Sequence, residues 1–170
     1  GDRNTIREYC TFNTGTSKED STTRIGSDNW IMAYVHIAHD VQIGDHTILA
    51  NNATLAGHVR VGDWAVIGGL TGVHQFVKIG AHAMVGFQAH VAQDVAPFMT
   101  VDGNPLATRA VNRTGLERRG FDDARIGIIR KMHKLIFRES LPLDDAKREI
   151  GKLLGTSSAE ADGDIRLMLD

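Results

Sequence analysis

A strict six-residue period of aliphatic side chains is the feature that most constrains how this 170-residue chain can fold. Every sixth residue from 25 to 91 is isoleucine, leucine or valine: Ile25, Ile31, Ile37, Ile43, Leu49, Leu55, Val61, Ile67, Val73, Ile79, Val85 and Val91. The residue four places after each of these is small or β-branched, with Asn29 as the exception. Neither the 3.6-residue period of a helix nor the two-residue alternation of a single strand produces this pattern. We therefore predict a mainly β protein, a parallel β-helix built from hexapeptide repeats.

The repeat also sets the expected domain boundaries. Three hexads make one coil of 18 residues, so residues 25–96 predict about four coils, and Ile6 and Phe12 extend the pattern upstream. We expect the β-helix to span residues 1–96, with the polar stretch 13–24 leaving it as a loop. Residues 97–113 contain Pro, Gly and Asn and predict a connection.

Residues 114–170 predict a small α-helical C-terminal domain. Asp122 suits the N-cap of a helix that runs to about residue 138, and two shorter helices fit residues 143–154 and 159–169. Three cations four residues apart form a stripe on one face of the first of these helices. They are Arg130, Lys134 and Arg138.

Composition argues against several classes of function. The chain holds no run of about 18 apolar residues, which a membrane-spanning helix requires. Its single cysteine, Cys10, allows neither an intramolecular disulfide nor a cysteine metal cluster. No signal peptide opens the sequence, so we expect a cytoplasmic protein. The net charge of −2 argues against a nucleic-acid partner.

The six-residue register predicts where the histidines of the repeat point. The first and fifth positions of each hexad face inward, and no histidine between residues 25 and 96 occupies either one. Residues 18 apart stack on neighbouring coils, about 4.8 Å from each other. This register places His39 beside Gly57 and Asp40 beside His58. On the same face we also expect His74 and Gln75, while His36 ends the preceding face and turns into the corner.

Such a cluster permits either a metal site or a proton-transfer site. Zinc requires three or four converging ligands, and the β-helix carbonic anhydrases use two histidines separated by four residues, a spacing that this sequence lacks. Asp40 next to His39 better suits a general base and the residue that orients it. A glycine at position 57 would let a substrate approach a backbone N–H, which can stabilise an oxyanion. We therefore favour acyl transfer to a hydroxyl, without a metal.

Five segments carry a family resemblance: "VHIAHD", "LANNATLAGHV", "IGGLTGVHQF", "IGAHAMVGF" and "GLERRGF". Together they closely resemble the UDP-N-acetylglucosamine O-acyltransferases, which begin lipid A biosynthesis in Gram-negative bacteria. The resemblance implies a left-handed β-helix and a homotrimer with its active sites between subunits, and it implies no cofactor. The implied reaction moves a (R)-3-hydroxyacyl chain from acyl carrier protein to the 3-hydroxyl of UDP-N-acetylglucosamine.

The resemblance also implies roles for individual residues. His39 matches the general base, Asp40 the residue that orients it, and Gly57 the glycine whose N–H holds the oxyanion. Positions around the sugar, the nucleotide and the acyl donor are matched by His36, His58, His74, Gln75, Asn112, Arg118 and Arg119. With an acidic carrier protein as donor, we expect the stripe of Arg130, Lys134 and Arg138 to form its docking surface.

The sequence departs from the family at three places. Asn13 stands where the family often has histidine, and Phe87 stands where some members have glycine in the acyl-chain groove. Because a phenylalanine adds substantial volume to such a groove, we predict a shorter acyl chain, or one that bends elsewhere. Gly1 fits the position after a missing aliphatic residue, so we expect a piece of a longer sequence. The alternatives are another hexapeptide-repeat enzyme, either an N-acyltransferase or a zinc enzyme like carbonic anhydrase, and an inactive structural repeat.

Overall fold

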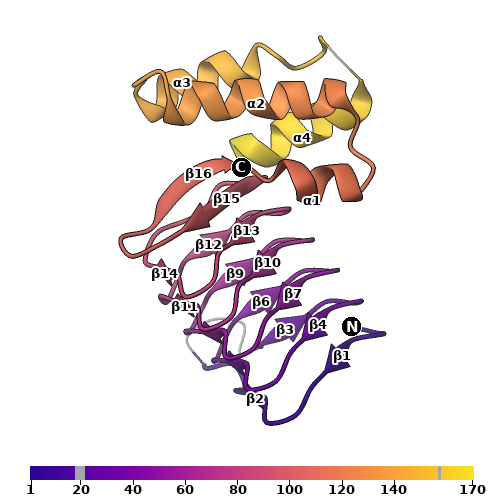
Figure 1. The fold of residues 1–170 in the computed structure, drawn as a ribbon, viewed down its shortest axis with the longest axis vertical. Coiled ribbons are helices and arrows are strands. Elements are labelled where there is room, and N and C mark those ends of the chain that lie inside the picture. The colour runs from indigo at the N-terminus through magenta and orange to yellow at the C-terminus, as the bar shows by residue number, and fades with distance from the viewer. Residues whose placement is uncertain (18–21, 157) are drawn as a thin grey trace. The chain divides into compact units, whose positions relative to one another are not determined.

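The computed structural model describes residues 1–17, 22–156 and 158–170, and Figure 1 shows its ribbon. The chain divides into two compact units, Gly1–Arg109 and Ala110–Asp170. The first unit is a parallel β-solenoid and the second is helical, which confirms the predicted fold class.

Short strands follow one another at regular intervals along the first unit (Figure 1). The two-residue strands are β1 (Thr5–Ile6), β2 (Thr11–Phe12), β3 (Arg24–Ile25), β4 (Trp30–Ile31), β5 (His36–Ile37), β6 (Gln42–Ile43), β7 (Ile48–Leu49), β8 (Thr54–Leu55), β9 (Arg60–Val61), β10 (Val66–Ile67), β11 (Gly72–Val73), β12 (Lys78–Ile79), β13 (Met84–Val85) and β14 (His90–Val91). Two longer strands follow, β15 (Met99–Asp102) and β16 (Ala107–Val111). The stretch 97–113, expected to be a connection, therefore contains both of these strands.

The strands form three sheets, in which the pairs from β1 to β15 are parallel. Their orders are β1-β4-β7-β10-β13-β15-β16, β14-β11-β8-β5-β2 and β12-β9-β6-β3. In the second of these sheets His36 pairs with Thr54, and Thr54 pairs with Gly72. Partners thus lie 18 positions apart, as the predicted coil requires.

The interior of the solenoid is filled by the first and fifth positions of the hexads. From Ile25 to Val95 every one of these positions is buried except Ile25, which is half-buried. Three of these positions are polar, Asn29, Thr47 and Thr71. Asn29 Oδ1 accepts hydrogen bonds from the backbone N of Thr47 at 2.7 Å and from Thr47 Oγ1 at 2.6 Å. Burial of this continuous aliphatic column is the main force that holds the coils in register.

The turns from β3 to β14 each contain one residue in the left-handed region of φ. From Tyr34 to Gln88 these corner residues recur every six positions, and none is glycine. Their backbone N–H groups donate to the coil before: His58 N to His39 O and Phe76 N to Gly57 O, both at 3.1 Å. Left-handed φ is unfavourable for such residues, so the regular hydrogen bonds and the buried interior must offset its cost.

The first coil is longer than the others. Thr5 pairs with Trp30 and Thr11 with His36, which are 25 positions apart rather than 18, so this coil has seven additional residues. They fall between β2 and β3, where the loop 13–24 was predicted. The part of that loop at residues 18–21 lies outside the described residues.

The second unit consists of four helices: α1 (Arg113–Arg118), α2 (Asp123–Phe137), α3 (Leu143–Gly151) and α4 (Ala159–Leu169). Asp122 caps α2 as predicted, because its side chain accepts a 2.8 Å hydrogen bond from Arg125 N. Arg125 also donates two hydrogen bonds, of 2.8 and 2.9 Å, to the buried carboxylate of Asp164 in α4. Among the described residues, no helix is both long and apolar enough to cross a membrane.

Candidate active site

His39 and Asp40 form a hydrogen-bonded pair at the corner that follows β5. His39 Nδ1 lies 3.0 Å from Asp40 Oδ2. The Asp40 side chain is 0% exposed, whereas 42% of the His39 side chain is exposed. An ionised carboxylate accepts hydrogen bonds and does not donate them, so the pair requires the proton on Nδ1 and leaves the lone pair of Nε2 available. A base oriented in this way can take a proton from a bound hydroxyl.

Asp40 is held by the start of the loop that leaves the solenoid. The backbone N of Thr16 donates to Oδ1 at 2.9 Å and to Oδ2 at 3.1 Å, and Thr16 Oγ1 donates to Oδ2 at 2.7 Å. The Thr16 hydroxyl is the main cause that lowers the pKa of Asp40 to about 2; burial opposes this, and the hydrogen bond from His39 supports it. Asp40 is therefore a carboxylate at any physiological pH. Thr16 was not among the predicted site residues.

The His39 ring lies directly over Gly57 of the next coil. A Cβ on Gly57 would lie 2.5 Å from Cε1 and 2.7 Å from Nε2 of His39, distances that no real side chain adopts. The position therefore requires glycine for a reason the sequence did not reveal. The residue also brings its backbone close to Nε2, the nitrogen that would act as the base.

Gly57 is a buried residue, and its N–H lacks the acceptor that is found at other corners. At the equivalent hexad position of another corner, Ser27 N donates to Asp45 Oδ1 at 2.6 Å and Asp45 N donates to Asp63 Oδ1 at 2.8 Å. Gly57 N donates no hydrogen bond to any described residue. A base nitrogen and an amide donor without an acceptor among the described residues thus lie side by side, an arrangement suited to acyl transfer to a hydroxyl.

His58 completes the cluster on the side of Asp40. Its Nε2 lies 3.8 Å from Asp40 Oδ2, and its ring meets the His39 ring edge-on at 5.1 Å between centroids. Phe76 of the following coil stacks on the other face of His58 at 4.6 Å. The predicted neighbours His39, Asp40, Gly57 and His58 therefore lie together.

The side chains of His39, Asp40 and His58 place possible metal-ligand atoms within 4.8 Å of one another. The carboxylate oxygen that would have to bind the ion, Asp40 Oδ2, already accepts the Thr16 hydroxyl at 2.7 Å and lies 3.0 Å from His39 Nδ1. A metal at this point would have to displace both groups. The donors around Asp40 therefore favour a hydrogen-bonded pair over a zinc site.

Three further predicted residues lie on the same side of the solenoid. His36 lies in β5 itself, and its Nδ1 is 2.7 Å from Thr11 Oγ1. The prediction that His36 ends the preceding face and turns into the corner is wrong, because it begins a strand of the same sheet as Thr54. His74 and Gln75 are exposed one coil beyond Gly57, with His74 Nδ1 3.1 Å from the Gln75 carbonyl oxygen.

The remaining predicted residues on helices belong to the second unit. Asn112 is buried and caps α1, its Oδ1 accepting a 3.2 Å hydrogen bond from Gly115 N. Arg118 is exposed, and burial lowers the pKa of the half-buried Arg119. The stripe residues Arg130, Lys134 and Arg138 are all exposed, and Lys134 Nζ lies 3.1 Å from Glu139 Oε1.

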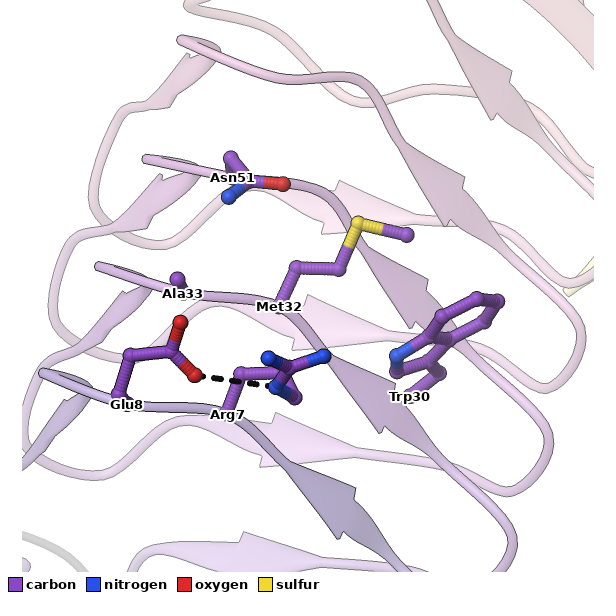
Figure 2. Close-up of a pocket in the computed structure, with 6 residues that line it drawn as sticks. All are labelled: Arg7, Glu8, Trp30, Met32, Ala33 and Asn51. Atoms are coloured by element: carbon purple, nitrogen blue, oxygen red, sulfur yellow. Dashed lines mark hydrogen bonds and ion pairs between the residues drawn. The ribbon is translucent and has the colours of Figure 1, made fainter.

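A ribbon of apolar side chains runs along the outer surface of the first sheet. Its members are register neighbours on successive coils: Trp30, Ile48, Val66 and Met84. A pocket of about 150 Å³ lies at its N-terminal end, and Figure 2 shows Trp30 and Met32 there beside the ion pair of Arg7 and Glu8. The predicted chain-length residue Phe87 is 67% exposed and lies over Gly69, 3.5 Å from the position of a Cβ there.

Comparison with known proteins connects this geometry to one family. Residues 94–170 match the family model of UDP-N-acetylglucosamine O-acyltransferase, domain 2, and residues 22–57 match the bacterial transferase hexapeptide model. The chain is 70% identical over 171 residues to the acyl-acyl-carrier-protein–UDP-N-acetylglucosamine O-acyltransferase of Leptothrix cholodnii, covering 100% of this chain and 65% of the relative. The protein of the same name from Verminephrobacter eiseniae is 61% identical, with 99% and 64% covered.

Solved structures agree with these sequence matches. The UDP-N-acetylglucosamine O-acyltransferase of Moraxella catarrhalis superposes with a TM-score of 0.94 at 40% identity, covering 100% of this chain and 64% of that one. LpxA from Acinetobacter baumannii superposes with a TM-score of 0.92 at 38% identity, covering 99% and 64%. The chain thus spans a little under two thirds of the length of the relatives that it matches.

The lowered pKa of Asp40 predicts a particular dependence of stability on pH. A carboxyl whose pKa is about 2 when folded and near 3.9 when unfolded stabilises the fold fully above about pH 4, and this contribution is lost as pH falls through 2. In Asp40→Asn an amide nitrogen has to face the Thr16 donors. We expect this variant to unfold at lower urea concentration than the unmodified protein at pH 7, with the difference shrinking between pH 4 and pH 2. A difference that stays constant down to pH 2 would contradict this reading.

Proposed function

This chain belongs to the UDP-N-acetylglucosamine O-acyltransferase family, and we propose that it forms the catalytic part of an enzyme that begins lipid A biosynthesis. The enzyme transfers a (R)-3-hydroxyacyl chain from acyl carrier protein to the 3-hydroxyl of UDP-N-acetylglucosamine. One observation carries the proposal: the exposed ring of His39 is held by the buried carboxylate of Asp40 and lies over Gly57, whose N–H donates to no described residue.

The reaction begins with proton transfer from the sugar to His39. Asp40 keeps the proton on Nδ1, so Nε2 accepts the proton of the 3-hydroxyl as its oxygen attacks the thioester carbonyl of the acyl donor. The imidazolium that forms lies next to the ionised Asp40, which stabilises it electrostatically. A general base of this kind contributes roughly 10²–10⁴-fold to the rate.

The second half of the reaction uses Gly57 and then His39 again. Attack on the carbonyl creates a tetrahedral oxyanion, which the Gly57 N–H stabilises as a hydrogen-bond donor. When this intermediate collapses, the carbon–sulfur bond breaks, the ester bond to the sugar remains, and His39 returns its proton to the departing thiolate. The proton taken from the 3-hydroxyl thus ends on the thiol, and the cycle requires no cofactor.

Substrates must enter from outside the solenoid, because its interior is filled. We assign His36, His58, His74 and Gln75 to the sugar nucleotide and acyl donor, since they surround His39 on the outer face. In the second unit Asn112, Arg118 and Arg119 are assigned to the nucleotide and donor, for which arginine provides phosphate-binding geometry. Asn13, which replaces the family histidine, would offer the phosphates a neutral amide.

A homotrimer with active sites between subunits gives a function to the apolar ribbon of Trp30, Ile48, Val66 and Met84. In this column Trp30 is exposed and Ile48, Val66 and Met84 are half-buried, and an apolar column of this kind is typical of a surface that another molecule covers. The ribbon of one subunit would line the cleft opposite His39 of the next and provide an apolar wall for the acyl chain. The exposed cations Arg130, Lys134 and Arg138 would dock acidic acyl carrier protein. A nucleotide sugar and a carrier protein as substrates also support a cytoplasmic location.

Replacement of His39 by alanine tests the base directly. We expect His39→Ala to lower kcat for acyl transfer by about 10²–10⁴-fold, because the variant lacks the imidazole that takes the hydroxyl proton. The measurement is thiol release from an acyl carrier donor by the intact enzyme that carries these residues. His46→Ala is the matched control, since His46 is a corner histidine of similar exposure that stacks on Trp64.

Two outcomes would contradict the proposal. Near wild-type transfer by His39→Ala would show that His39 is not the base. Stoichiometric zinc in a protein without acyl transfer would favour a zinc enzyme on the same scaffold. A control variant that loses activity as strongly as His39→Ala would show that the loss reflects folding rather than chemistry.

Phe87 is expected to limit the length of the acyl chain. Its exposed ring covers Gly69 and reduces the space along the outer surface of the solenoid. We expect the intact enzyme to prefer shorter 3-hydroxyacyl donors, and Phe87→Gly to shift the preference to longer ones, as measured by kcat/KM over a series of chain lengths. A preference for the longest donor that Phe87→Gly leaves unchanged would show that Phe87 does not measure the chain.

A further inference from the structure

Asp40 occupies a corner at which the regular hydrogen bonding of the solenoid is interrupted. Elsewhere the N–H of a corner residue donates to a carbonyl of the preceding coil, as His58 does to His39 and Phe76 does to Gly57. The coil before Asp40 is the long one, and its loop leaves the solenoid at the place where that carbonyl would lie. The Asp40 N–H donates instead to Thr23 Oγ1 at 2.9 Å.

Thr23 is itself fixed by the other end of the same loop. Its hydroxyl donates to the Asn13 carbonyl oxygen at 2.7 Å, so one oxygen both accepts from Asp40 and donates to Asn13. The neighbouring carbonyl of Thr22 accepts a 2.7 Å hydrogen bond from Gln42 Nε2. The returning end of the loop is thus tied to both sides of the Asp40 corner.

Thr16, at the departing end, holds the side chain rather than the backbone. Its N–H and hydroxyl make three contacts of 2.7 to 3.1 Å with the two carboxylate oxygens. Oδ2 is the oxygen that also faces His39 Nδ1. Rotation of the carboxylate away from His39 would therefore break the bonds to Thr16 as well.

We propose that Thr16 and Thr23 are positioning residues for the catalytic pair: Thr23 fixes the Asp40 backbone, Thr16 fixes its carboxylate, and the imidazole of His39 is oriented through them. The two described ends of the loop, 13–17 and 22–24, thereby contribute to the active site by orienting Asp40. The inference rests on the proposed function, because it assigns the threonines to the base that this function requires. Neither residue needs to touch substrate.

Removal of the Thr16 hydroxyl separates this role from a merely structural one. In the intact enzyme, Thr16→Val is expected to lower kcat by about 10-fold to 100-fold with KM changed less than about 2-fold, because ground-state binding does not involve the hydroxyl. The carboxyl carbon of Asp40, followed by NMR, should titrate at higher pH in this variant. Thr16→Ser keeps the hydroxyl and should restore both properties, and Thr16→Ala replaces the valine variant if valine prevents folding.

Thr47→Val is the matched control. Thr47 also donates its hydroxyl to a side-chain oxygen, that of Asn29 at 2.6 Å, but in the interior and away from Asp40. We expect it to lower the thermal unfolding midpoint and to leave kcat and the Asp40 titration unchanged. Thr23→Val should lower kcat as Thr16→Val does, and Thr23→Ser should restore it.

Failure of this inference differs from failure of the proposed function. If His39→Ala abolishes transfer while Thr16→Val and Thr23→Val retain kcat and the Asp40 titration within about 2-fold, the threonines are not positioning residues. If His39→Ala itself retains wild-type activity, the proposed base is wrong and the inference falls with it.

Discussion

Burial of two side chains in every six is the constraint on which the rest of the solenoid depends. With the first and fifth positions inside, the fourth turns a corner in the left-handed region of φ. Equivalent residues then stack one coil apart, which brings His39 over Gly57 and Asp40 beside His58. Residues 18 positions apart in sequence thus become a single site without any long connection.

The Asp40 corner is the one at which this regularity is broken. A buried carboxylate is costly unless it is hydrogen-bonded. In the regular repeat the backbone N–H groups already donate to carbonyls of the neighbouring coil, so few of them can bind a carboxylate. The additional residues of the first coil supply Thr16 and Thr23 as partners that are not members of the repeat. The departure from the hexapeptide period and the ionised state of Asp40 therefore have the same structural cause.

Much of this architecture follows from sequence, because a period of six depends on burial alone. The inward positions, the coil of 18 and the neighbours His39, Asp40, Gly57 and His58 were predicted and confirmed. The roles of Thr16 and Thr23 were not, because hydrogen bonds from an irregular loop have no period to reveal them. His36 was misplaced for a related reason: a two-residue strand leaves its exact starting residue undetermined by pattern.

The central claim is that His39, held by Asp40 over Gly57, is the base that activates the sugar hydroxyl. A crystal structure of the intact enzyme with UDP-N-acetylglucosamine tests it most directly. The account predicts the sugar between two chains, beside Gln75, with its 3-hydroxyl about 2.6–3.2 Å from His39 Nε2. A sugar bound with that hydroxyl out of reach of His39, or held by one chain on a different face of the solenoid, would contradict it.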